Sequence, residues 1–206
     1  MSRQIATILS WVFHPVWLTP VLAWLIIRAN PVLFSGKDQG LILILTTVLT
    51  VLMPVLSLLI LRGLGMIDSL ELDERKQRII PMIAIATFYL WAYFGLLKPG
   101  LPTLISSPSI LADMLLGGGI VIGLAFAINS VLKVSLHAAG LGAAIGVLWN
   151  VLPMSSASLL VPFLAAILIA GLVGTARMAL GKHTLSEIML GYFVGFVGQF
   201  AAYQVL

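Results

Sequence analysis

The sequence predicts an all-α protein, a polytopic bundle of about seven transmembrane helices. Three observations carry this prediction: 61% of the 206 residues are hydrophobic, only 9% are charged, and charges and Pro/Gly clusters divide the chain into long apolar runs. A soluble domain of this size could not bury so much apolar surface, whereas a bilayer accepts it at the surface. One domain is expected over residues 1–206, with a motif-bearing core at about 130–206.

A spanning helix needs about 20 consecutive, mostly apolar residues, and charges and Pro/Gly clusters mark out seven candidate stretches, of which the fifth is short. They cover residues 5–27, 41–61, 79–97, 110–132, 138–152, 159–175 and 183–203. The first contains His14-Pro15 and Pro20, which would kink it or turn it into an element that lies in the membrane interface. The bundle therefore has seven spans, or six if the first stretch does not cross.

The last three stretches are rich in glycine. Gly142 with Gly146, and Gly191 with Gly195, form pairs at four-residue spacing. Such small faces let helices approach closely in lipid, so these three helices are expected to form the compact core. The Gly117-Gly118-Gly119 run in the fourth stretch is either a packing face or a flexible point, and the sequence leaves both interpretations open.

Charge and cysteine content narrow the chemistry. Eleven Lys and Arg residues stand against seven Asp and Glu, and the positive charges are scattered through the loops. Membrane lipids and lipid phosphates are therefore the expected partners. Binding to nucleic acid is not expected. The absence of cysteine excludes a disulfide, a thiolate nucleophile and a Cys-ligated metal. His, Asp, Glu and Ser must carry any reaction, and neither a cofactor nor a metal is expected.

Three polar segments are expected on one face of the membrane: residues 62–78, 133–137 and 177–182. Two spans separate each segment from the next, which returns the chain to the same side. These segments hold nearly all the polar residues that could do chemistry. The sequence thus predicts a site at this face.

The strongest motif is Arg177, five residues, His183, three residues, Glu187. If His183 opens the last helix, Glu187 lies one turn further on the same face and can bind one ring nitrogen, leaving the other free as a nucleophile. Arg177, at the end of the preceding helix, could bind a phosphate with two hydrogen bonds. Taken singly, Arg177 and Lys182 are better explained as anchors at helix ends. Glu187, however, lies inside an apolar helix, where an ionisable group marks function or a buried partner.

A second cluster consists of Lys133, Ser135 and His137. In an extended loop these alternate residues point to one side and bring together a cation, a hydroxyl and a titratable ring. The alternative interpretation is a lysine anchor, a helix-capping serine and a histidine satisfied by backbone, which is the better one for this segment alone.

Together the two segments resemble the type 2 phosphatidic acid phosphatase superfamily, which includes soluble acid phosphatases and vanadium haloperoxidases. Its members carry a Pro-Ser-Gly-His motif and, two helices later, a motif of Ser-Arg, five residues, His, three residues and Asp. The matched positions are Ser135 and His137 for the first motif, and Arg177 and His183 for the second, with Ala176 in place of Ser and Glu187 in place of Asp. The resemblance leaves the first two helices outside the motifs.

The resemblance implies an integral-membrane lipid phosphatase that works through a phosphohistidine and needs no metal. In such an enzyme His183 attacks phosphorus, and Glu187 orients its ring and stabilises its positive charge. His137, on the opposite side of the phosphoryl group, protonates the departing alkoxide.

The resemblance also implies residues that hold the phosphate oxygens. Arg177, Lys133 and Ser135 are expected in this role. The family's remaining motif, Lys, six residues, Arg-Pro, is absent in strict form. The nearest segment, residues 74–81, offers Arg75 and Arg78 as phosphate ligands.

Two other functions stay open. A magnesium-dependent lipid-phosphate transferase would need two aspartate-rich sites, whereas only the cluster at residues 68–74 is present. A non-catalytic lipid-phosphate binder or transporter is compatible with the missing first motif and with Glu in place of Asp. The sequence does not choose among phosphatidate, phosphatidylglycerol phosphate and polyprenyl diphosphate as substrate, nor decide whether the chain forms a homo-oligomer.

The resemblance places the chain in a bacterial inner (cytoplasmic) membrane. Eight Lys and Arg residues lie on the motif face against three on the other, which by the positive-inside rule would make the motif face cytoplasmic. Four of the eight are candidate phosphate ligands, and without them the rule decides nothing. Analogy with bacterial relatives favours the outer side.

Overall fold

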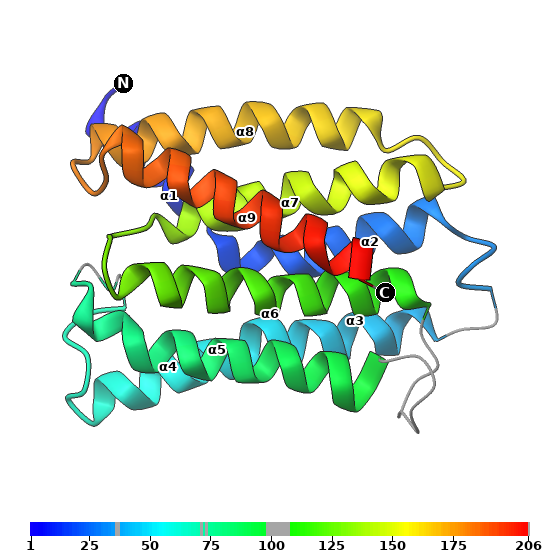
Figure 1. The fold of residues 1–206 in the computed structure, drawn as a ribbon, viewed down its shortest axis with the longest axis horizontal. Helices are drawn as coiled ribbons and strands as arrows, with labels where there is room; N and C mark the ends of the chain where they lie inside the picture. Colours follow the sequence, from blue (N-terminus) through cyan, green and yellow to red (C-terminus); the bar gives the residue numbers. More distant parts are fainter. Residues whose placement is uncertain (36–37, 71, 73, 98–107, 206) are drawn as a thin grey trace.

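The chain folds into a bundle of long helices (Figure 1). The computed structural model describes residues 1–35, 38–70, 72, 74–97 and 108–205, and within these ranges it contains helices and no strand. Seven stretches are long and apolar enough to cross a membrane: Arg3–Ala29, Gln39–Gly63, Lys76–Gly95, Ser109–Asn129, Leu136–Met154, Leu160–Ala179 and Leu185–Gln204. The predicted all-α bundle with seven spans is confirmed, and these spans indicate an integral membrane protein.

The α-helices are α1 (Arg3–Val12), α2 (Leu18–Ala29), α3 (Gln39–Thr47), α4 (Met53–Gly63), α5 (Ile79–Trp91), α6 (Ser109–Asn129), α7 (Leu136–Val151), α8 (Leu160–Ala179) and α9 (Leu185–Val205). Short 3₁₀ segments are η1 (Pro15–Trp17), η3 (Lys76–Arg78) and η5 (Leu152–Met154), and two π-helical segments are η2 (Val48–Leu52) and η4 (Ala92–Leu97). The sequence also predicts a turn at residues 98–102, which contain a lysine, a glycine and two prolines, and this segment lies outside the described residues.

The first span is broken in two, as one of its prolines predicts. His14 takes an extended conformation (φ −65°, ψ 135°) after α1 ends, because the residue before a proline is disfavoured in the helical region. Its ring nitrogen Nδ1 accepts a hydrogen bond from Val16 N–H at 3.3 Å and caps η1. Pro20 does not interrupt α2, since it lies in the first turn, where no backbone N–H is needed.

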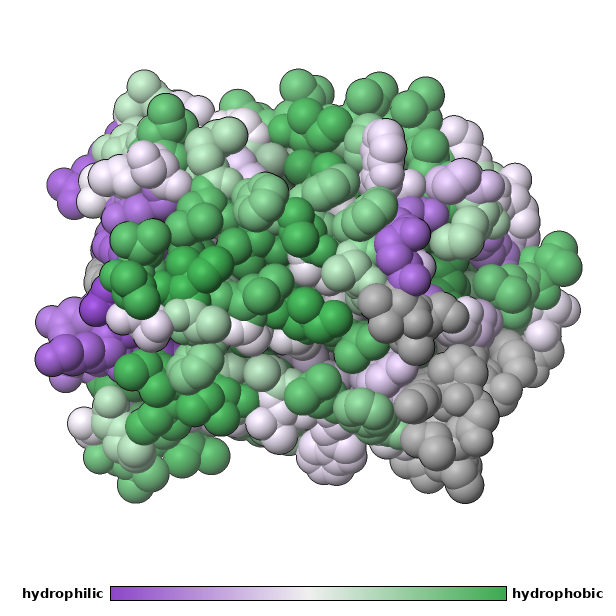
Figure 2. All heavy atoms as spheres, in the orientation of Figure 1, coloured by the Kyte–Doolittle hydropathy of each residue, from purple (hydrophilic) through white to green (hydrophobic). Residues whose placement is uncertain are grey.

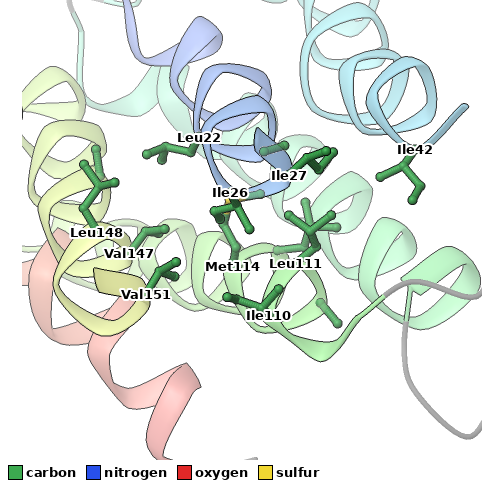
Figure 3. Packing of buried hydrophobic residues seen from close by; sticks show 14 of the residues in the cluster. Leu22, Ile26, Ile27, Ile42, Ile110, Leu111, Met114, Val147, Leu148 and Val151 are labelled. Carbon is green, nitrogen blue, oxygen red and sulfur yellow. The ribbon is translucent and has the colours of Figure 1, made fainter. Parts of the chain in front are cut away.

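An apolar core joins α2, α6 and α7. Figure 3 shows Ile26 of α2 packed among side chains of α6 and α7, including Met114 and Val147. Ile26 and Leu111 are completely buried. Lipid tails are as apolar as these side chains, so close van der Waals packing rather than escape from solvent holds such a core together.

Glycines bring α7 and α9 into close contact. A Cβ atom on Gly195 would collide with the Ala139 carbonyl, and one on Gly191 would lie 2.7 Å from Ser135 O. Gly142 is equally close to the backbone of α9. The predicted close approach is confirmed for these two helices. It holds the first turn of α7 against the first turns of α9, where the candidate site lies.

The expected core of the last three helices needs one correction, because α6 rather than α8 is the second neighbour of α9. α8 packs mainly against α7 and α1. The glycine run of α6 supplies the necessary face, since Gly117 lies against Gln199 of α9 and Gly118 against Tyr89 of α5. The run is therefore a packing face, the first of the two interpretations left open.

The polar segments gather at one end of the bundle. In Figure 1 the α4–α5, α6–α7 and α8–α9 connections all lie at the left end with the amino terminus. Figure 2 shows strongly hydrophilic residues at that end, while apolar side chains cover much of the middle. The expected common face of the three segments is therefore observed. We refer to the described residues among 64–78, 130–137 and 177–184 as the polar end.

Candidate functional site

His183 follows directly on the C-terminal cap of α8. Gly181 takes a left-handed conformation (φ 68°) and donates its N–H to Met178 O at 2.9 Å, and Lys182 N–H donates to Arg177 O at 3.1 Å. These two bonds form a common glycine cap, and glycine adopts this φ without strain. The five residues between Arg177 and His183 are thus one helix cap. The cap turns the chain back and leaves His183 buried, with 8% of its surface exposed.

His183 and Glu187 form the pair that their spacing predicts, with Nδ1 of the ring 2.7 Å from Glu187 Oε2. An ionised carboxylate only accepts hydrogen bonds, so Nδ1 carries the proton and Nε2 keeps its lone pair. One detail of the prediction is wrong: α9 begins at Leu185, so His183 precedes the helix instead of opening it. The reason is Thr184, whose Oγ1 accepts the Glu187 N–H at 3.3 Å and caps the helix.

The start of α7 is attached to the start of α9 through Ser135. Its N–H donates to Glu187 O at 3.3 Å, and its hydroxyl accepts from Ala138 N–H at 3.4 Å as the N-cap of α7. This cap starts the helix at Leu136, so the expected extended loop through His137 is wrong. Ser135 is completely buried. In this arrangement it is the helix-capping serine of the alternative interpretation.

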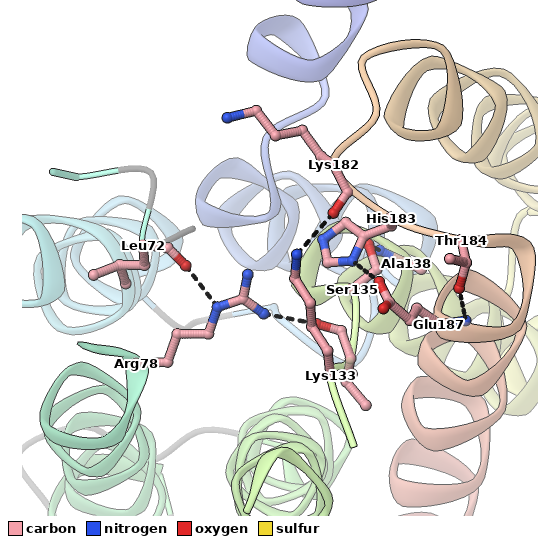
Figure 4. A network of polar contacts seen from close by, with 10 residues as sticks. Leu72, Arg78, Lys133, Ser135, Ala138, Lys182, His183, Thr184 and Glu187 are labelled. Carbon is pink, nitrogen blue, oxygen red and sulfur yellow. Dashed lines mark hydrogen bonds and ion pairs between the residues drawn. The ribbon is translucent and has the colours of Figure 1, made fainter. Parts of the chain in front are cut away.

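Lys133 connects the α6–α7 connection to the α8–α9 connection. Its Nζ donates to Lys182 O at 3.0 Å. Figure 4 shows the Lys133 ammonium beside the His183 ring, on the side opposite Glu187, with the second ring nitrogen pointing toward it. The free nitrogen of His183 therefore faces a cation.

The structure separates the two arginines predicted at the start of the third span. Arg78 is 4% exposed and donates Nε to Leu72 O at 2.6 Å and Nη1 to Val134 O at 2.9 Å. Its guanidinium group points toward the Lys133 side chain in Figure 4. Arg75 is exposed and donates to Val131 O at 2.5 Å. Arg78, rather than Arg75, thus takes part in the cationic surroundings of His183.

The surroundings of His183 favour its neutral form. Burial lowers the pKa of its imidazole to about 4, the hydrogen bond to Glu187 works in the opposite direction, and the positive charges of Arg177, Arg78 and Lys133 lower the pKa further. The Nε2 lone pair is therefore available at neutral pH. Three cations beside a neutral imidazole form a place where an anion is stabilised and a nucleophile is ready.

His137 lies at the same end of the bundle but is held by the first span. Its Nε2 is 3.1 Å from Ser10 O, a backbone carbonyl of α1. The rings of His137 and His14 meet edge to face, with centroids 4.9 Å apart and an interplanar angle of 83°. Arg177, half-buried in the last turn of α8, and His183 both lie near enough to act electrostatically on His137.

Two residues of this neighbourhood, Ser10 and His14, are absent from the sequence prediction. From the sequence, His14 is expected only as part of a helix break. A signal did exist, because a titratable side chain within an apolar stretch is costly and marks a function or a partner. The sequence also carried the Thr184-Leu185-Ser186-Glu187 pattern of a capping box, which predicts a helix start after His183.

The acidic cluster at residues 68–74 is described only in part. Asp68 and Glu74 are exposed, and the Gln77 side-chain amide donates to both. Glu71 and Asp73 lie outside the described residues. In the described part of the chain, no group of three or more His, Asp or Glu side chains is arranged to hold a metal ion.

The polar end thus combines a neutral, carboxylate-paired imidazole with a half-buried second imidazole and with three cations: Arg78 before α5, Lys133 between α6 and α7, and Arg177 in the last turn of α8. Such a set can bind an anion and attack it. In comparisons with known proteins, no family model, no curated protein and no solved structure matches this chain.

Proposed function

We propose that this chain is an integral-membrane lipid phosphatase of the type 2 phosphatidic acid phosphatase superfamily, which hydrolyses a lipid phosphate through a phosphohistidine on His183. The observation that carries the proposal is the position of His183 Nε2. Glu187 holds the opposite ring nitrogen at 2.7 Å, and the free nitrogen faces Lys133 with Arg78 behind it. A nucleophile surrounded by cations suits an anionic electrophile such as a phosphoryl group.

In the proposed first step, His183 Nε2 attacks phosphorus and forms a P–N bond as the P–O bond to the lipid breaks. The phosphoryl oxygens carry negative charge that Arg177, Arg78 and Lys133 offset. The leaving alkoxide takes a proton from His137. Glu187 stabilises the positive charge that appears on the phosphorylated imidazole. Water then attacks phosphorus, breaks the P–N bond and releases inorganic phosphate, and its proton returns to His137.

The position of the site supports a lipid substrate. The polar end lies at the ends of the membrane-spanning helices, where lipid headgroups are found, and apolar side chains cover much of the middle of the bundle in Figure 2, at the depth of the lipid tails. Phosphatidate, phosphatidylglycerol phosphate and polyprenyl diphosphate remain the candidate substrates. We place the site on the outer face of a bacterial inner membrane by analogy alone, and a reporter fused to the carboxy terminus, expected on the opposite face, tests this.

The test is phosphate release by purified protein from these three lipids, with and without EDTA. The proposal expects release from at least one lipid that survives EDTA and is blocked by vanadate, which mimics the pentacoordinate phosphorus. Loss of all activity in EDTA would instead favour the magnesium-dependent transferase. Tight binding of every lipid without phosphate release would identify a binder or transporter.

A further inference from the structure

We infer that His14 is a positioning residue of the reaction proposed above, and that it acts by holding the ring of His137 through their edge-to-face contact. The inference rests on the proposed function. His14 belongs to a different span from His137, and the break in the first span is what brings it there.

The contact is fixed from both sides. Pro15, next to His14, packs on α7 at Gly140, where an added Cβ would lie 2.8 Å from the Pro15 Cβ. Gly140 lies three residues after His137, on the same side of the helix. The His14 ring is itself oriented, because its Nδ1 accepts Val16 N–H at 3.3 Å. The broken span is therefore seated on the turn of α7 that carries His137.

Both described contacts of the His137 ring come from this broken span. Ser10 O can only accept, so His137 Nε2 carries a proton and is directed at 3.1 Å toward α1. The other nitrogen, Nδ1, is left to exchange a proton with the leaving group. A ring fixed by a single hydrogen bond can still swing about it, and the His14 ring, 4.9 Å away at 83°, blocks that motion.

This role makes the consequence of losing His14 depend on the leaving group. Protonation by a general acid matters greatly for an alkoxide, which is a poor leaving group, and little for p-nitrophenolate, which leaves without help. A residue that only stabilised the fold would affect both substrates equally.

The experiment compares His14→Asn with His14→Phe on dioleoyl phosphatidate and on p-nitrophenyl phosphate. Asn keeps an acceptor for the Val16 N–H but removes the ring, whereas Phe keeps a ring and loses the acceptor. We expect His14→Asn to lower kcat about tenfold on phosphatidate, which is less than the full contribution of a general acid because His137 itself remains. On p-nitrophenyl phosphate we expect kcat to fall less than about threefold. His14→Phe should stay within about threefold of wild type on both.

Thr7→Ala, at an exposed position of α1 in the same broken span, is the matched control and should leave both rates unchanged. Equal losses on the two substrates, no loss in His14→Asn, or a loss in His14→Phe as large as that in His14→Asn would each overturn this inference alone. A wild type that releases phosphate from neither substrate, nor from the other lipids, would overturn the proposed function and this inference with it.

Discussion

The two histidines of the polar end are held in different ways. His183 is paired with Glu187, four residues further along its own segment, whereas His137 is bonded to the Ser10 carbonyl, 127 residues away in sequence. The first partner is a carboxylate and the second is a neutral carbonyl. A carboxylate stabilises a positive charge on its ring more strongly than a neutral carbonyl does. In the proposed reaction, this difference favours His183 for the charged intermediate and leaves the proton transfer to His137.

The largest expected effect is that of His183→Ala. This substitution removes the proposed nucleophile, so phosphate release should fall by about 10⁴-fold or more. Ser186→Ala, an exposed position in the first turn of α9, is the control and should keep wild-type activity. Initial rates on the best lipid substrate check both variants. Substantial activity in folded His183→Ala protein would show that His183 is not the nucleophile and that the proposed difference between the two histidines is wrong.

Glu187→Gln should have the next largest effect. Gln keeps an oxygen that can accept from His183 and suits the third position of a capped helix, but it lacks the charge that stabilises the phosphorylated ring. We expect kcat to fall about 100-fold while the melting temperature changes by less than about 3 °C. An unchanged kcat would show that the charge of Glu187 plays no part in the reaction.

The two arginines near the third span provide a matched pair with a smaller effect. Arg78→Lys keeps the charge but cannot donate to Leu72 O and Val134 O together, so about a tenfold loss of kcat/KM is expected. Arg75→Lys, at an exposed position, should change kcat/KM less than about twofold. The opposite order of effects would reassign the phosphate-binding role to Arg75.

The smallest expected effect concerns the protonation of the His183 ring as the pH changes. Because burial and the nearby cations lower the pKa of His183 to about 4, its ring should stay neutral from pH 8 down to pH 5 and become protonated only as the pH falls through about 4. Nuclear magnetic resonance of the ¹⁵N-labelled rings, assigned through single His→Asn variants, measures this directly. A titration midpoint of the His183 signal near 6.5, the ordinary value, would contradict the described electrostatics.

The sequence predicts the parts of this molecule that depend on neighbours along the chain. Hydrophobic runs predict seven spans, and the His183 to Glu187 spacing predicts their pairing, because residues four apart lie on one face of a helical turn.

The parts that could not be predicted depend on contacts between distant segments. Nothing near His137 in the sequence indicates that its partner is a backbone carbonyl of α1, since every residue has such a carbonyl. The difference between Arg75 and Arg78 depends on which of them reaches Val134 and Leu72, and thus on how α5 packs. The neighbours of α9 depend in the same way on how Gln199 fits against Gly117.

The most direct test of the central claim is to trap the phosphorylated enzyme. Wild-type protein mixed with the lipid that it hydrolyses fastest, quenched in alkali within one turnover and digested, should carry an acid-labile, base-stable phosphoryl group on the peptide containing His183, as seen by mass spectrometry. His183→Ala protein should carry none. Continued hydrolysis by wild-type protein with the phosphoryl group on another residue, or on no residue under conditions that preserve phosphohistidine, would contradict the account.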